Sequence, residues 1–220
     1  MMGIADNLRR LREQIPAGVK IIAVSKNQLP EQIALAYSCG QRDFGENKVQ
    51  EIIRKQPLLP PDIEWHFIGH LQSNKVRYIA PFIHMVHSVD SLKLLKEIDD
   101  QGMKHSRSIR CLLQFHIAKE ETKYGLSLEE ARKILNSAAF SKMKNIRIDG
   151  VMGMATFTGD EKTVGEEFRH LREIFHILRQ EFFMGSDHFC ELSMGMSSDF
   201  MIAVNEGTTM VRIGTSIFVD

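Results

Sequence analysis

The chain has 220 residues, of which 43% are apolar and 25% charged, a composition typical of a globular protein and not of a disordered one. Lysine plus arginine and aspartate plus glutamate both number 28, so the formal net charge is zero and favours neither a nucleic acid nor an anionic membrane as a partner. No stretch approaches the roughly 18 apolar residues of a membrane span, and the scattered Cys39, Cys111 and Cys190 indicate reduced thiols in a cytoplasmic protein.

The predicted elements alternate along the chain. The first residues, MMGIADNLRRLREQI, have the pattern of an amphipathic helix and lack the apolar core of a signal peptide. Apolar or β-branched runs and helical patterns then follow one another. The predicted strands cover 19–24, 41–44, 64–68, 83–87, 109–116, 147–152, 188–192 and 209–213. The predicted helices cover 31–39, 46–55, 73–79, 91–101, 127–139, 161–183 and 198–205.

Strands that alternate with helices predict parallel βα units and an α/β fold. Eight such units match a closed (β/α)₈ barrel of the TIM type, at the small end of its size range. We therefore expect one barrel domain over residues 1–220 with an extra N-terminal helix. The sequence ends at Asp220, soon after the eighth strand, so we expect no appended domain. A doubly wound open sheet is the alternative, because some strands, above all 41–44, are short.

Lys26 follows the first predicted strand, in the stretch IIAVSK. Active sites of parallel barrels lie at the C-terminal ends of the strands, so Lys26 would lie at the barrel mouth. Desolvation there would lower the pKa of its amine and make it a nucleophile towards an aldehyde. A lysine at this position can also be the residue at which a strand meets solvent.

Two turns with glycine and hydroxyl residues follow the last two strands, in LSMGMSSDF at 192–200 and VRIGTS at 211–216. Glycine lets the backbone approach a ligand closely. Ser197 or Ser198 is placed to cap the next helix, whose free N–H groups attract an anion. Barrels often hold a phosphate in the loops after strands seven and eight, so the two turns predict a phosphorylated ligand. Plain βα turns are the alternative.

Other polar residues lie on strands or near their ends. Arg212 must be paired or used if it faces the barrel interior, and is a surface residue if it faces outward. Asn47 is either a helix cap or a donor to a ligand. His66 and His70 are four residues apart, but their span crosses a strand and a glycine and no carboxylate is placed beside them, so we expect no metal site. We interpret four methionines near strand ends as packing of the pocket wall: Met152, Met154, Met194 and Met196.

Several ordered blocks of sequence run from about residue 21 to about residue 218: AVSK, DFGENKVQE, WHFIGHLQSNK, HSVDS, LSMGMSSDF and VRIGTSIF. They resemble the signature blocks of the YggS/PROSC family of pyridoxal phosphate homeostasis proteins. The resemblance implies an alanine-racemase-like barrel, the type III fold of enzymes that use pyridoxal 5′-phosphate (PLP), without the second β domain of alanine racemase. It implies PLP held as an internal aldimine on Lys26. It also implies Ser197, Gly214 and Thr215 around the phosphate, Arg212 near the pyridine nitrogen and Asn47 close to the cofactor.

The residues themselves agree with what PLP needs, which is an amine, an anion site and a partner for the ring nitrogen. Arginine is always charged and can only donate, so Arg212 favours an unprotonated ring nitrogen and weakens carbanion stabilisation. The sequence departs from the usual family residues at Asn27 and Gln28, in HIAKEETKYG at 116–125 and in MGMATF at 152–157. These departures concern the outer pocket.

We therefore expect a protein of intracellular vitamin B6 homeostasis without established turnover, which holds PLP as a Schiff base and buffers or delivers it. The expected partners are PLP and other B6 vitamers, with apo PLP enzymes as candidate recipients, and neither nucleic acid nor membrane. One alternative is a PLP-dependent amino-acid racemase or decarboxylase, and another is a phosphosugar-type barrel enzyme without PLP. A racemase needs two bases on opposite faces of the α-carbon, and the sequence does not place Tyr37, Tyr78 or Tyr124 opposite Lys26.

Overall fold

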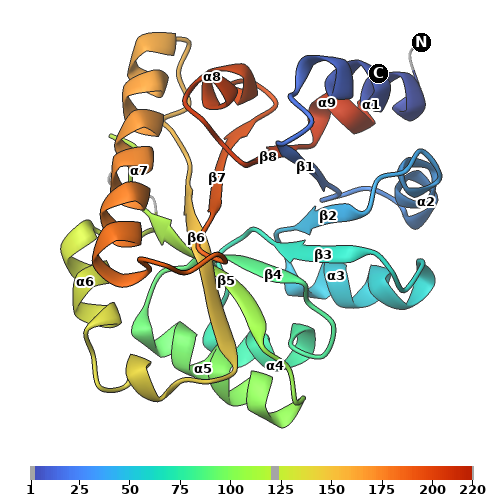
Figure 1. Cartoon of the computed structure of the whole chain (residues 1–220). Coiled ribbons are helices and arrows are strands. Elements are labelled where there is room, and N and C mark those ends of the chain that lie inside the picture. Colours follow the sequence, from blue (N-terminus) through green and yellow to red (C-terminus); the bar gives the residue numbers. More distant parts are fainter. Residues whose placement is uncertain (1–2, 120–123, 220) are drawn as a thin grey trace.

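A computed structural model describes residues 3–119 and 124–219 of the chain (Figure 1). Within these residues, the strands pair in parallel and in chain order from β1 to β8, and β8 pairs with β1 to close a barrel. The predicted (β/α)₈ barrel is therefore confirmed. The doubly wound alternative is wrong, because an open sheet would leave β1 and β8 unpaired with each other.

The strands are β1 (Lys20–Val24), β2 (Asp43–Glu46), β3 (Glu64–Phe67), β4 (Met85–Val89), β5 (Ile109–Phe115), β6 (Ile146–Gly153), β7 (Glu191–Met196) and β8 (Met210–Ile213). The α-helices are α1 (Ile4–Gln14), α2 (Pro30–Ser38), α3 (Val49–Lys55), α4 (Val76–Ile79), α5 (Leu92–Lys104), α6 (Leu128–Leu135), α7 (Glu161–Phe182), α8 (Phe200–Asn205) and α9 (Thr215–Phe218). Short 3₁₀ helices cover η1 (Gln56–Leu58), η2 (Ser73–Lys75) and η3 (Phe140–Lys142). The predicted N-terminal helix is α1, whereas η1, η3 and α9 were not predicted.

The predicted bounds are displaced most at β7, which we expected at 188–192 and which runs three to four residues later. We interpreted the stretch around Gly195 as a turn, but it belongs to the strand. Gly195 has a φ of 93°, a conformation that side chains other than glycine rarely adopt. A Cβ atom there would lie 2.6 Å from the Cβ of Ala203, so glycine allows α8 to pack closely against β7.

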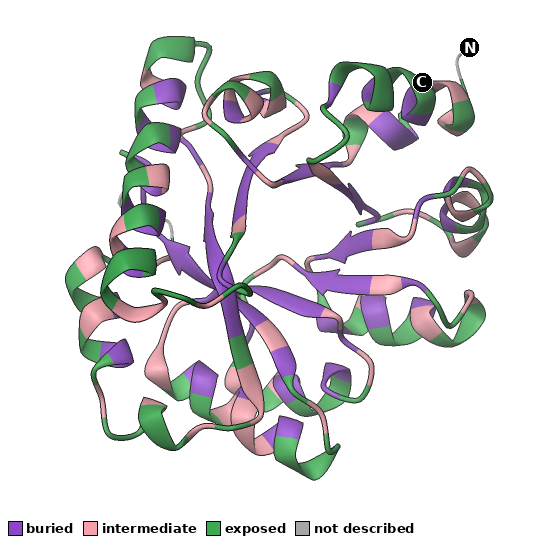
Figure 2. Ribbon diagram, in the orientation of Figure 1, coloured by how far each residue is buried: buried purple, intermediate pink, exposed green. Residues whose placement is uncertain are grey.

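Helix α7 shows how the outer layer covers the barrel. Its residues Val164, Phe168 and Leu171 are buried, and buried residues in the following turns extend this apolar stripe, which packs on the core. Figure 2 shows the buried residues concentrated on the strands and on the inward sides of the helices. No helix in the described part of the chain, α7 included, is long and apolar enough to cross a membrane.

The two ends of the described chain lie side by side (Figure 1). The side-chain Nδ2 of Asn7 in α1 donates to the carbonyl oxygen of Ile217 in α9 at 3.1 Å. This contact closes the helical layer next to β1, which Lys26 follows, and β8, which contains Arg212.

The interior of the barrel contains both apolar and polar side chains. The apolar cluster consists of Ile22, Met85, Leu112, Met152 and Met210, which pack together. The polar residues are His66, His87, Ser193 and Arg212, all buried. Barrel interiors are usually filled by branched apolar residues, and buried polar groups need hydrogen-bond partners. The hydrogen-bond partners of these four residues therefore bear on what the barrel interior does.

Candidate functional site

The C-terminal ends of the strands surround a cavity of about 750 Å³. All of the residues selected from the sequence line it: Lys26, Asn47, Ser197, Arg212, Gly214 and Thr215. They come from the ends of β1, β2, β7 and β8, the end of a parallel barrel at which active sites lie. The volume is that of a site for a small organic ligand.

Lys26 lies two residues beyond β1. The strand residues before it and Ser25 are buried, whereas Lys26 is exposed. The desolvation that we expected is therefore not present, because the mouth of the cavity is open on this side. Among residues 3–119 and 124–219, no hydrogen-bond or ion-pair partner is recorded for the Lys26 amine. Asn27 turns the chain away with a φ of 63°, a conformation that asparagine tolerates better than most residues.

A buried ion pair supports the end of β1 from behind. Lys55, in α3, donates from Nζ to the carbonyl oxygen of Ser25 at 2.9 Å and to Oε1 of Glu46 at 2.8 Å. The Ser25 hydroxyl donates to the same Glu46 oxygen at 2.7 Å. Burial raises the pKa of Glu46, and the hydrogen bonds from Lys55 and Ser25 act in the opposite direction. The buried Lys55 ammonium therefore holds in place the backbone that precedes Lys26.

Sequence reasoning missed this ion pair. A lysine at the end of a helical pattern is normally on the solvent side, and we placed Glu46 outside the second strand, which was expected at 41–44. The signal that does exist is the charged DFGENK run itself, because a strand that ends in a carboxylate needs a partner if that end is buried.

The two glycine and hydroxyl turns meet. The backbone N–H of Gly214 donates to the Ser197 hydroxyl at 3.3 Å. The prediction that Ser197 or Ser198 caps the next helix is wrong, because α8 begins after Asp199. Ser197 instead connects the turn after β7 to the turn after β8. Thr215 and Ser216 line the cavity at the start of α9, and the first amides of a helix have no acceptor within it.

Arg212 faces the barrel interior, so the outward-facing alternative is wrong. Its NH1 donates to the Ser193 hydroxyl at 2.6 Å and its NH2 to the carbonyl oxygen of Gly153 at 2.8 Å. Burial lowers the pKa of Arg212 to about 10, and the charge of Asp199 acts against this shift. No ion pair is recorded for Arg212 within the described parts of the chain. A guanidinium has five N–H donors, so donors remain for a ligand in the cavity.

Asn47 is held at the cavity by its neighbour Gly69. A Cβ atom on Gly69 would lie 2.3 Å from the carbonyl oxygen of Asn47, so only glycine permits this approach. The cap interpretation of Asn47 is wrong, because the residue at the start of α3 is Lys48 and no side-chain cap is formed there. The role of Asn47 as a donor to a ligand stays a prediction.

Aromatic residues and methionines form the rim. The rings of His70 and Tyr124 stack with centroids 4.0 Å apart, and Gln114 donates to the Tyr124 carbonyl oxygen at 2.8 Å. Met154 and Met196 line the cavity as predicted, whereas Met152 and Met194 are buried away from it. Within the segment 116–125 that departs from the family, residues 120–123 lie outside the described residues.

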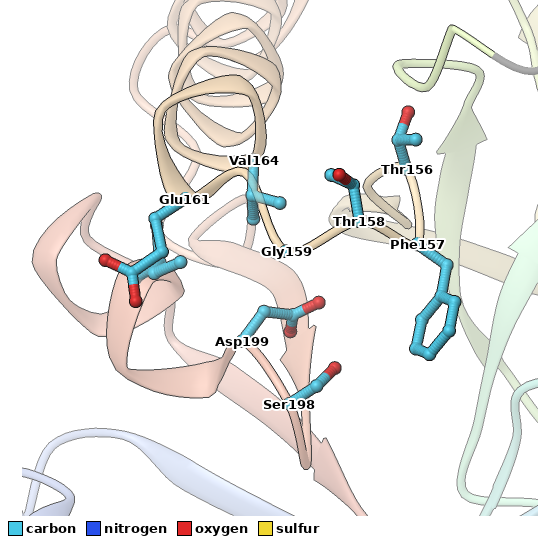
Figure 3. Close-up of a pocket in the computed structure, with 9 residues that line it drawn as sticks. Thr156, Phe157, Thr158, Gly159, Glu161, Val164, Ser198 and Asp199 are labelled. Atoms are coloured by element: carbon cyan, nitrogen blue, oxygen red, sulfur yellow. The ribbon is translucent and has the colours of Figure 1, made fainter.

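A smaller cavity of about 120 Å³ adjoins the rim and shares Phe157 and Ser198 with the main cavity. Figure 3 shows the 156–159 loop facing Ser198 and Asp199, with the Phe157 ring projecting from the loop. The MGMATF departure at 152–157 therefore reaches the outer edge of the site only at its end. Our expectation that the departures concern the outer pocket alone is wrong, because the Gly153 carbonyl oxygen accepts from Arg212 in the interior.

Histidines also gather at the opposite, N-terminal end of the barrel. His66 and His70 do not form a pair, because His66 is in the interior and His70 is on the rim. In the described residues, Glu64, His66 and His84 bring their ligand atoms within 4.8 Å of one another. However, the Arg110 NH1 lies 2.7 Å from the His84 Nε2. This cation occupies the lone pair that a metal would need.

The fold and the site together define a class of protein. Residues 2–220 match the family model described as the alanine racemase N-terminal domain. The structure resembles alanine racemase from Bartonella henselae with a TM-score of 0.71 at 14% identity, over 97% of this chain and 57% of that chain. This likeness shows the barrel fold alone and corresponds to just over half of that racemase.

More similar proteins identify the family. The chain is 37% identical to the pyridoxal phosphate homeostasis protein of Aquifex aeolicus over 99% of this chain and 98% of that protein. It is 35% identical to the protein of the same name from Escherichia coli K12, over 99% and 97%. It resembles PipY of Synechococcus elongatus, solved with PLP bound, with a TM-score of 0.88 and 38% identity over 98% of this chain and 99% of that chain. The chain belongs to the family of pyridoxal phosphate homeostasis proteins.

Proposed function

We propose that residues 1–220 form one PLP-binding domain that works in intracellular vitamin B6 homeostasis. The chain would hold PLP as a Schiff base on Lys26 and buffer it or deliver it to other proteins. The observation that carries the proposal is the meeting, in one cavity, of the Lys26 amine, the joined Ser197 and Gly214 turns and the buried Arg212. The names of the relatives and the PLP in the PipY structure support it.

The residues present fit the chemical groups of PLP. The exposed Lys26 amine suits an aldehyde, and the hydroxyls and amides of the two turns suit a phosphate. The remaining donors of Arg212 suit an aromatic ring nitrogen. When bound, PLP supplies an aldehyde that condenses reversibly with an amine, so one lysine serves storage as well as release. Asn47 completes the proposed set of ligand-binding residues.

Two features favour a carrier over an enzyme. Lys26 lies at an open mouth, where incoming amines and water reach it. Arg212 can only donate, so it disfavours a protonated ring nitrogen and with it the strong electron sink that carbanion chemistry uses. We propose PLP and B6 vitamers as ligands, with apo PLP enzymes as recipients.

The test is an absorption spectrum of the protein incubated with PLP, before and after borohydride reduction, followed by peptide mapping. We expect visible absorbance and a single modified lysine, Lys26. Lys26→Ala should lose the reducible absorbance, whereas the control Lys48→Ala, an exposed lysine near the same cavity, should keep it. Absence of PLP absorbance in the unsubstituted protein would refute the proposal and favour a phosphosugar-type enzyme.

One observation supports testing the racemase alternative. Tyr124 lines the same cavity as Lys26, whereas Tyr37 bonds Asp62 on the outer surface and Tyr78 contacts Arg77. Steady racemisation of one amino acid that Tyr124→Phe abolishes would favour an enzyme. Absence of turnover with an intact PLP spectrum would favour the carrier.

A further inference from the structure

A continuous chain of hydrogen bonds crosses the barrel interior from the proposed cofactor site to its opposite end. Arg212 NH1 lies 2.6 Å from the Ser193 hydroxyl, which lies 3.1 Å from Nδ1 of His87. Nε2 of His87 lies 2.8 Å from Nδ1 of His66. Nε2 of His66 lies 3.1 Å from Oδ1 of Asp43. The contact between β4 and β7 carries the chain across the barrel, because these two strands are not neighbours.

The ends of this chain, together with neutral imidazoles, fix the direction of every bond in it. Arg212 can only donate, and the Asp43 carboxylate can only accept. Each hydrogen bond therefore points from Arg212 towards Asp43, and each imidazole carries its proton on Nε2 and accepts at Nδ1. An additional proton on His66 would place its Nδ1–H against the Nε2–H of His87 unless that ring changed tautomer, and one on His87 would turn the Ser193 hydroxyl from a donor into an acceptor. His66 and His87 are fully buried, and burial lowers the pKa of both, which keeps them neutral as this pattern requires.

Asp43 supplies the negative charge at the far end. Burial alone would raise its pKa, but the hydrogen bond to His66 and the Lys20 amine at 3.0 Å outweigh burial and hold the pKa well below its usual range. Arg212 forms no ion pair with the described residues. The charge of Asp199 acts on it through space, and the charge of Asp43 is connected to it through polarised hydrogen bonds. Such chains strengthen the bonds within them.

The polar chain is not what packing alone would select. The apolar cluster of Ile22, Met85, Leu112, Met152 and Met210 lies in the same interior, so apolar side chains fit this barrel. Buried polar groups stabilise a fold only when every member is satisfied, and a hydrophobic replacement is often as stable. The chain is fully bonded, and it ends on the residue that faces the cavity. Its residues also lie on strands, which hold side chains more rigidly than loops do.

We propose that Ser193, His87, His66 and Asp43 are positioning residues, which fix the orientation of the Arg212 guanidinium so that the ring nitrogen of the ligand always meets the same donor. This inference rests on the proposed binding of PLP. It predicts that changes in Ser193 or Asp43 alter the electronic state of bound PLP although neither residue touches Lys26.

The first test needs no ligand. In the ¹⁵N-histidine NMR spectrum of the protein without PLP, His66 and His87 should both be neutral Nε2–H tautomers at neutral pH. A charged ring, or an Nδ1–H tautomer at either position, would overturn the chain.

The second test measures PLP. Ser193→Ala should shift the visible absorption maximum of bound PLP and release PLP faster, because the Arg212 guanidinium loses the acceptor of its NH1 and its orientation is no longer fixed. Ser193→Thr, which keeps a hydroxyl, should return both values towards those of the unsubstituted protein. The matched control is Ser88→Ala, because Ser88 is also buried and no partner of its hydroxyl is found in the described chain.

Asp43→Asn tests the far end of the chain and should shift the spectrum in the same direction by a smaller amount. Its control is Glu191→Gln, since Glu191 lies at the same end of the barrel, is equally exposed at 16% and bonds Arg110 instead of the chain. If the spectra of Ser193→Ala and Asp43→Asn match those of their controls, the positioning role is wrong. Failure of borohydride to label Lys26 in the unsubstituted protein would instead refute the proposed function, so the two failures are distinguishable.

Discussion

Lys55→Met tests whether the buried ion pair behind Lys26 holds the site together. Lys55 and Glu46 have side chains only 1% and 0% exposed. The substitution removes hydrogen bonds to Ser25 and Glu46 and an ion pair with Glu51. Glu46 would keep only the Ser25 hydroxyl, because its Oε2 already has no partner in the described residues.

The expected loss follows from this geometry. Removing one partner of a buried ion pair costs about 3–5 kcal/mol, because the remaining charge is left uncompensated. That is a large part of the about 5–15 kcal/mol by which a domain is normally stable. Since burial raises the pKa of Glu46, its protonation would relieve part of the loss, and the deficit should shrink as the pH falls towards that raised pKa.

Urea unfolding of the variants measures the free energy of unfolding directly. The control is Arg54→Met, one residue earlier in α3, whose exposed ion pair with Glu51 should be worth at most about 0.5 kcal/mol. The double variant Glu46→Leu/Lys55→Met should recover most of the loss, because apolar replacement of a buried pair is often neutral or stabilising. If Lys55→Met is no less stable than Arg54→Met, the assigned role of the pair is wrong.

Three further predictions concern the cavity and the interior. Gly69→Ala should displace the Asn47 backbone, cost about 1–3 kcal/mol of unfolding free energy and lower PLP affinity; an unchanged affinity would remove Asn47 from the site. Arg212→Ala should shift the PLP spectrum and release PLP about 10-fold faster or more, and an unchanged spectrum would exclude the ring-nitrogen role. Burial lowers the pKa of His66, His87 and His84 below the value of about 6.5 in an unfolded chain, so below that pH the unfolded state binds up to three more protons. The free energy of unfolding should then fall as the pH falls, by up to about 4 kcal/mol per pH unit, and a flat urea-unfolding profile between pH 7 and 5 would contradict neutral histidines in the fold.

Local sequence patterns were sufficient to predict the barrel fold and the residues that lie around its mouth. Lys26, Asn47 and Gly214 follow strands, and parallel strands bring their C-terminal ends to one face, so sequence order alone predicts their meeting. The strand β7 was misplaced because Gly195 has the local signature of a turn. Only the packing of α8, which the sequence does not display, explains why that glycine lies within a strand.

The supporting contacts could not be predicted in the same way. His87 and Ser193 are 106 residues apart, and their hydrogen bond depends on the closure of the barrel. Lys55 is the last residue of the predicted helix 46–55, whose pattern gives no sign that this lysine is buried. Polar residues inside a closed barrel are indistinguishable, in sequence, from those that face solvent on a weak strand. Tertiary structure alone decides which of them become partners.

The two supporting clusters act on different parts of the site, and this gives a combined test. Lys55 and Glu46 hold the backbone before Lys26, whereas the chain from Asp43 to Ser193 holds Arg212. Lys55→Met should therefore slow the labelling of Lys26 by PLP and borohydride and leave the absorption maximum in place. Ser193→Ala should do the reverse. Because Lys26 itself is exposed, such a site can fix the ring and the attachment point and still leave the amine open to exchange. If both variants change both measurements equally, the clusters form one unit and the separation of attachment from ring recognition is wrong.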